Sequence, residues 1–104
     1  MKKTFSILVL LAVATTLASC GNTNTSFDLE TETEIVVGLE AAYAPFNWST
    51  PTENDFTVEI DGQPGMYADG FDVVMAQAIA DDLGLTLVIR AIEWDGLIPA
   101  LLAG

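Results

Sequence analysis

Two short apolar runs constrain the fold of this chain more than any other feature of its sequence. Residues 35–39 read Ile-Val-Val-Gly-Leu and residues 85–89 read Leu-Thr-Leu-Val-Ile. Both have the length and the β-branched content of buried parallel strands. Between them, an apolar residue recurs every four positions at Phe71, Met75, Ile79 and Leu83, with Val74 and Ala78 beside this row. That spacing predicts a helix with one apolar stripe.

A second helix is predicted over residues 94–103, directly after the second strand. We expect Asp72 to cap the start of the first helix and Gly84 to close its end in a left-handed conformation. In the second helix we expect Asp95 to be the cap and Pro99 to lie near the first turn.

The stretch before the first helix predicts a long loop and then a hairpin. Residues 56–60 alternate like a half-exposed strand, a turn follows at Asp61 and Gly62, and residues 63–69 return. The predicted order is strand, hairpin, helix, strand, helix. Because crossovers between parallel strands are right-handed, this order predicts an open α/β sheet with helices on its faces. Ligands of such sheets bind beyond the carboxyl ends of the strands, here residues 39–46 and 91–95.

The first residues resemble a secretion signal. Lys2 and Lys3 precede a weakly polar run from Phe5 to Leu17, so we expect residues 1–19 to be a signal peptide. A transmembrane helix is the alternative, but about thirteen residues cover only about 20 Å of a hydrocarbon core of about 30 Å.

The end of this signal resembles a bacterial lipobox. The residues Leu-Ala-Ser-Cys-Gly end the apolar run, and Cys20 is the only cysteine of the chain. We expect Cys20 to carry the lipid anchor, although an ordinary secreted protein with a free thiol is an alternative. Residues 20–34 are too polar to bury a core, which predicts a flexible tether.

The charge balance excludes some partners. Without residues 1–19, Arg90 is the only base beside 15 acidic residues. Nucleic acid and anionic lipid headgroups are therefore not expected partners. The acidic excess is compatible with a cationic ligand, but we expect these charges mainly to solvate the surface.

Three motifs resemble one known family. Residues 37–46 (Val-Gly-Leu-Glu-Ala-Ala-Tyr-Ala-Pro-Phe) resemble the opening strand and loop of family 3 solute-binding proteins, the polar amino-acid receptors of ABC importers. Residues 70–80, beginning Gly-Phe-Asp-Val, resemble the entry of the family's first helix, and residues 94–101 (Trp-Asp-Gly-Leu-Ile-Pro-Ala-Leu) resemble the second. The resemblance covers residues 35–104. Residues 47–68 depart from it, because this stretch is longer than in the shortest members.

The resemblance implies a two-lobed type II periplasmic-binding-protein fold that holds a polar amino acid between its lobes. Residues 35–104 would be the start of lobe 1, and a body with only two clear core strands is expected to be a fragment of a longer chain. The family's groups for the ligand's carboxylate and amino ends lie downstream of Gly104, and Arg90 does not match them. We therefore expect residues 20–104 alone to bind amino acids very weakly or not at all.

The same resemblance assigns ligand contacts. Tyr43 matches the aromatic residue that stacks on the ligand, Trp94 matches the position that closes its other side, and Glu40 matches an acidic position near the side-chain end of a basic ligand. The alternatives are core aromatics for the two rings and a solvated loop glutamate for Glu40. Pro45 and Phe46 are expected to shape the loop.

The implied partners are the membrane subunits of an ABC importer, reached by an extracytoplasmic, lipid-anchored monomer. We expect no cofactor and no metal, because the chain has no histidine, no metal-ligand spacing and no phosphate loop.

The competing classes are a cyclohexadienyl dehydratase-like enzyme on the same fold, a receptor for another small solute, and a sensor domain. The missing nucleophile disfavours the first, and the lipobox disfavours the sensor.

Overall fold

The structure is a computed structural model, and it describes residues 27–104. The predicted signal peptide, Cys20 and the first part of the predicted tether lie outside the described residues. Before the first strand, the chain makes a turn in which the backbone N–H of Thr31 donates to the carbonyl oxygen of Asp28 at 3.0 Å. Within the described part of the chain, no helix has the length and apolar character needed to cross a membrane.

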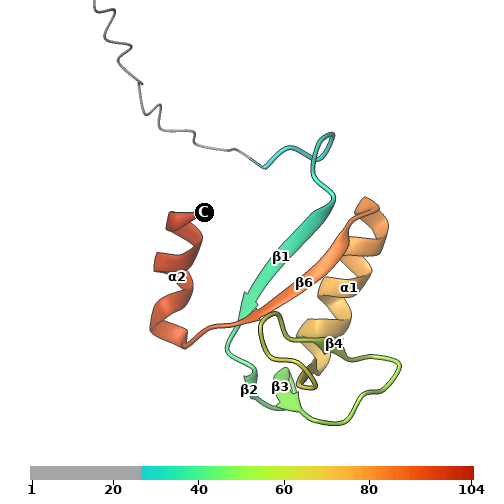
Figure 1. Ribbon diagram of the computed structural model, residues 1–104, viewed down its shortest axis with the longest axis vertical. Helices are drawn as coiled ribbons and strands as arrows, with labels where there is room; N and C mark the ends of the chain where they lie inside the picture. The colour runs from blue at the N-terminus through green and yellow to red at the C-terminus, as the bar shows by residue number, and fades with distance from the viewer. Residues whose placement is uncertain (1–26) are drawn as a thin grey trace, which may run out of the picture.

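The centre of the fold is a pair of parallel strands, β1 (Glu34–Leu39) and β6 (Thr86–Ala91). They pair over their whole length, from Glu34 opposite Thr86 to Leu39 opposite Ala91. Helices α1 (Phe71–Leu83) and α2 (Trp94–Ala103) lie on opposite sides of this pair (Figure 1). These observations confirm the two predicted strands, the two predicted helices and the α/β class.

Each helix covers one face of the strands. Because successive side chains alternate across a strand, Leu87 and Ile89 of β6 face α1 and pack in one buried cluster with Val73 and Ala80. On the other face, a Cβ at Gly38 would lie 3.2 Å from Leu97 of α2. A strand residue without a side chain therefore leaves room for α2.

The predicted apolar stripe of α1 is wrong. Its members Phe71, Met75, Ile79 and Leu83 are 40 to 61% exposed, whereas Val73 and Ala80 are fully buried. At 3.6 residues per turn, the row Val73, Ala76, Ala80 is rotated about the helix axis by roughly 110° from the centre of the predicted row. These smaller side chains let the helix approach the strands closely.

The three predicted helix caps, Gly84, Asp72 and Asp95, have different outcomes. Gly84 ends α1 in the left-handed conformation, with φ of 70°, as predicted. Asp72 does not cap α1, because the helix begins after Gly70 without a side-chain cap, and the carbonyl oxygens of Pro45 and Phe46 accept its first N–H groups instead. Asp95 does not cap α2 either, since it lies within the first turn and Glu93 holds the cap position. Pro99 lies inside α2.

A second, antiparallel sheet lies at the carboxyl ends of the parallel strands. Its strand order is β2 (Ala42–Tyr43), β3 (Asn47–Thr50), β5 (Tyr67–Asp69), β4 (Val58–Glu59). Strands β4 and β5 form the predicted hairpin, with Val58 opposite Ala68. Strands β2 and β3 were predicted as loop, because neither has an alternating apolar pattern of useful length.

The hairpin joins the two sheets. Ile60 forms a parallel bridge with Ile89, and the N–H of Asp61 donates to the carbonyl oxygen of Ile89 at 2.8 Å. Ile60, Ile89 and Val73 are the largest fully buried side chains. The core therefore lies where α1, β6 and the end of the hairpin meet.

Candidate functional site

The carboxyl ends of β1 and β6 lie side by side. Leu39 and Ala91 are the last paired residues, and the N–H of Ile92 donates to the carbonyl oxygen of Leu39 at 2.9 Å. Residues that follow both strands therefore leave the sheet at one edge. In open α/β sheets, this edge is where ligands bind.

The segment Glu40–Phe46, here named the β1 loop, follows the first of these ends. Ala41 is buried and adopts a φ of 55°, which turns the chain sharply after the strand. The N–H of Phe46 donates to the carbonyl oxygen of Tyr43 at 2.9 Å, and the peptide bond from Ala44 to Pro45 is cis. The β1 loop is thus a compact turn rather than an extended linker.

The end of the β1 loop lies against the start of α1. The N–H of Phe71 donates to the carbonyl oxygen of Pro45 at 3.2 Å, and the N–H of Asp72 donates to that of Phe46 at 2.8 Å. The first N–H groups of a helix have no partner within the helix, so the loop supplies acceptors that α1 needs. Gly70 permits this contact, because a Cβ there would lie 2.5 Å from the carbonyl oxygen of Phe46.

Tyr43 and Glu40 both lie on the β1 loop and both are exposed, with Tyr43 at 62%. The ring of Tyr43 stacks on the ring of Phe46, with centroids 5.4 Å apart and planes inclined by 21°. Neither ring is a core side chain. Tyr43 therefore presents a face to solvent while Phe46 supports the ring.

Trp94 begins α2, three residues after the end of β6, and is 70% exposed. With Asp95, Leu97 and Ile98 it lines a surface hollow of about 280 Å³. The structure brings the predicted residues Glu40, Tyr43 and Trp94 to the same edge of the parallel strands, although Tyr43 stacks on Phe46 and not on Trp94.

Acidic side chains surround this edge. Glu40 follows β1, and Glu93 and Asp95 flank Trp94, and all three are exposed. Arg90 lies at the end of β6, but its Nε donates to Asp61 Oδ2 of the hairpin at 3.2 Å. The charge available to a ligand beside the two aromatic residues is therefore negative, which suits a cationic side chain.

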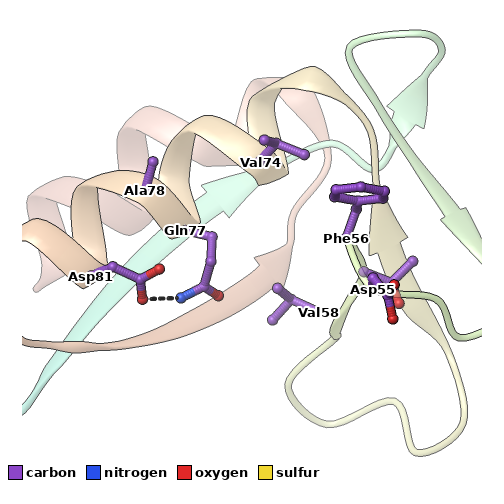
Figure 2. A pocket seen from close by; sticks show the side chains of 8 residues that line it. Asp55, Phe56, Val58, Val74, Gln77, Ala78 and Asp81 are labelled. Atoms are coloured by element: carbon purple, nitrogen blue, oxygen red, sulfur yellow. Dashed lines mark hydrogen bonds between the residues drawn. The ribbon is translucent and has the colours of Figure 1, made fainter.

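A second hollow lies away from this edge, between α1 and the loop before β4 (Figure 2). It measures about 380 Å³ and is lined by Asp55, Phe56, Thr57, Val58, Val74, Gln77, Ala78 and Asp81. Gln77 Nε2 donates to Asp81 Oδ1 at 2.8 Å, so part of its polar lining is already paired. In the described part of the chain, no three acidic, histidine or cysteine side chains are grouped so that they could hold a metal ion.

One ionisable group of the second sheet is clearly perturbed. Glu53, whose carboxylate oxygen lies 3.5 Å from the hydroxyl of Tyr67, raises the pKa of Tyr67 above its usual value, with smaller contributions from desolvation and from Glu59. Tyr67 pairs with Thr50, at the end of β3 that is farther from the β1 loop. It is therefore a feature of the hairpin and not of the candidate site.

Two residues of the site region were missed by sequence reasoning. Asn47 is buried and hydrogen bonds to Ala41 and Asp72, and Gly70 allows α1 to approach Phe46. Asn47 lies 6 and 25 positions from these partners. No local pattern could have revealed such contacts, although the family motif already contained Gly70.

Comparison with known proteins identifies the family. Residues 35–104 match the bacterial extracellular solute-binding proteins, family 3. The chain belongs to this family. The α/β arrangement of the described residues agrees with the two-lobed periplasmic-binding fold of this family, as the predicted fold class requires.

The chain is similar to three curated proteins. It is 29% identical to the arginine-binding extracellular protein ArtP of Bacillus subtilis, over 97% of this chain and 34% of the relative. It is 32% identical to the octopine-binding periplasmic protein of Rhizobium meliloti, over 69% of this chain and 20% of the relative. It is 38% identical to the L-arginine-binding protein of Pseudomonas aeruginosa, over 62% of this chain and 20% of the relative.

The chain therefore spans between a fifth and about a third of the length of these relatives. No solved structure matches the chain.

Proposed function

We propose that this chain belongs to an extracytoplasmic substrate-binding lipoprotein of an ABC importer, which captures a polar amino acid, with a cationic one favoured. The observation that carries the proposal is the shared edge of β1 and β6, where Leu39 and Ala91 end side by side. This edge bears two exposed aromatic rings and a surplus of carboxylates. The relatives named for arginine and octopine binding support the ligand class.

Each predicted contact has a chemical role in this proposal. Tyr43 and Trp94 would cover the two faces of a planar, positively charged side chain, since aromatic faces attract cations. Glu40 would pair with the guanidinium or ammonium group at the end of that side chain. Tyr43, Trp94 and Glu40 are exposed, as contact with a ligand requires. A binding measurement on variants of these residues tests the three roles.

Binding, and not catalysis, is the activity that we propose. The chain has no histidine, and its only cysteine is the proposed anchor residue Cys20. The three relatives are all named as binding proteins. A dehydratase-like enzyme on the same fold would need positioned acids and bases, and no observation at the edge of β1 and β6 favours that function.

The anchor and the partners complete the proposal. Cys20 would carry the lipid, residues 20–34 would tether the body, and the liganded form would dock as a monomer on the importer's membrane subunits. No cofactor is proposed. Labelling of cells with radioactive palmitate, in cells that express the natural protein or the Cys20→Ser variant, tests the anchor. The natural protein should carry the label and the variant should not, and equal labelling of the two would contradict lipidation of Cys20.

The ligand class is tested by thermal unfolding of the full-length mature protein, obtained from its gene, with a panel of amino acids at millimolar concentration. A ligand at 100 times its dissociation constant adds about 2.7 kcal/mol to the stability of the state that binds it. We expect the midpoint to rise by several degrees with one or a few polar amino acids, and most with arginine or lysine. A panel without any shift would contradict amino-acid binding and favour another small solute or the enzyme.

A further inference from the structure

Asn47 is the buried polar residue of the described chain, with 8% of its surface exposed. Its Oδ1 accepts the N–H of Ala41 at 2.8 Å, and its Nδ2 donates to Asp72 Oδ2 at 2.8 Å. One amide side chain therefore connects the first turn of the β1 loop to the first turn of α1. Both polar atoms of this buried amide have a partner, so the residue is costly to replace, since each lost partner leaves a buried polar atom unpaired.

The bond to Ala41 stabilises an unusual backbone. Ala41 is 6% exposed and has a φ of 55°, a conformation that residues other than glycine rarely adopt. Its N–H is removed from water and needs an acceptor, and Asn47 Oδ1 is that acceptor. Without this bond, the turn that directs the chain from β1 into the β1 loop loses its main local support.

The far end of the β1 loop is fixed by the same helix. Pro45 and Phe46 accept the N–H groups of Phe71 and Asp72, and the side chain of Asp72 accepts from Asn47. Tyr43 lies between these two attachments and is 62% exposed, so burial does not hold it in place. The direction of its ring depends on the attachments and on the stacked ring of Phe46.

We propose that Asn47 and Asp72 are positioning residues for ligand binding, which hold Glu40 and Tyr43 in the geometry that the ligand meets. This inference rests on the proposed function. The expected benefit is affinity, because a loop that is already ordered pays no ordering entropy when the ligand arrives. Neither Asn47 nor Asp72 needs to contact the ligand itself.

The hydrogen bond between Asn47 and Asp72 can be tested by exchanging the two side chains. In the Asn47→Asp variant, two carboxylates face each other at the former hydrogen-bond distance and repel. In the double variant Asn47→Asp with Asp72→Asn, the new carboxylate accepts from both the N–H of Ala41 and the new amide at position 72. Both hydrogen bonds and the net charge of the pair are thereby retained.

The test is calorimetric titration of the full-length mature protein with L-arginine, at a temperature where circular dichroism shows each variant to be folded. We expect the dissociation constant to rise at least about tenfold in Asn47→Asp and to return to within about threefold of the natural value in the double variant. If Asn47→Asp does not fold, Asn47→Ser removes the bond to Asp72 without adding charge, and the same loss is expected.

Asn54 provides a matched control. Its Oδ1 accepts the N–H of Phe56 at 2.8 Å and its Nδ2 donates to Asp69 Oδ2 at 3.0 Å, but neither partner belongs to the β1 loop. Asn54→Asp should leave the dissociation constant within about twofold of the natural value, because the pair is exposed and its charges are screened.

Three outcomes would overturn the inference in distinguishable ways. If the natural protein binds no amino acid, the proposed function is contradicted, and the positioning role is contradicted with it. Binding by the natural protein with unchanged affinity in Asn47→Asp would overturn positioning alone. A folded double variant that binds as weakly as Asn47→Asp would do the same, since its hydrogen bonds are intact.

Discussion

At the residue scale, Gly70 carries the strictest steric requirement of the site region. It has a φ of 117°, and a Cβ would lie 2.5 Å from the oxygen and 2.8 Å from the carbon of the Phe46 carbonyl. These are backbone atoms that cannot rotate away as a side chain can. Any side chain at position 70 must therefore separate α1 from the β1 loop.

We predict that Gly70→Ala destabilises the full-length mature protein by about 2–4 kcal/mol, from backbone strain and lost loop contacts together. The measurement is the midpoint of urea unfolding. Gly62→Ala is the control, because Gly62 also has a positive φ, of 75°, but nothing lies within 4 Å of its Cβ position. It should cost about 1 kcal/mol. Equal losses in the two variants would show that the contact with Phe46 is unimportant.

Residue roles were predictable from sequence only where the cause is local. Gly84 follows the last turn of α1, and its left-handed conformation was predicted from that position alone. Asp72 also has a position typical of a cap, but its carboxylate accepts from the buried amide of Asn47 instead. The carbonyl oxygens of the β1 loop accept the first N–H groups of the helix. Those competitors lie more than 20 residues away in sequence, so no local rule includes them.

At the scale of elements, the contact between β1 and α2 determines where Trp94 lies. Gly38 faces α2, and a Cβ there would lie 3.2 Å from Leu97 Cδ2 and 3.3 Å from Ile92 Cδ1. The contacted atoms are ends of flexible side chains. A methyl group can therefore be accommodated, but a branched side chain would push α2 outward.

We predict that Gly38→Ala changes the urea midpoint only slightly, whereas Gly38→Val lowers stability by about 1–3 kcal/mol through overpacking. Because Trp94 begins α2, Gly38→Val should also weaken amino-acid binding. Val36→Ile is the control: it adds one methylene on the same face of β1, where Val36 is 47% exposed, and should change neither property. Unaltered stability of Gly38→Val would contradict the close approach of α2 to β1.

The positions of the helices and long strands were predicted better than which face of each is buried. Long apolar or periodic segments gave β1, β6, α1 and α2 with bounds close to those observed. The buried face of α1 was wrong, because large residues define the strongest period while the small residues Ala76 and Ala80 allow the closest packing. Strands β2 and β3 were missed because they are short and depend on pairing with β5 and not on their own sequence.

At the scale of the whole molecule, two functional elements meet because the central strands are parallel and in register. The β1 loop and the start of α2 are separated by about fifty residues in sequence but follow Leu39 and Ala91, which are paired. The α/β class and the ligand edge were predictable from element order. The second sheet, whose edge strand β2 lies within the β1 loop, was not.

Tyr43 and Trp94 are proposed to hold a polar amino acid at the shared edge of β1 and β6. Calorimetric titration of L-arginine into the full-length mature protein and into its Tyr43→Ala and Trp94→Ala variants measures what each ring contributes. A cationic side chain stacked on an aromatic ring contributes on the order of 1–2 kcal/mol to binding, so each variant should bind L-arginine about tenfold more weakly with an unchanged fold. Unchanged affinity in both variants, or no binding by the natural protein, would contradict the claim.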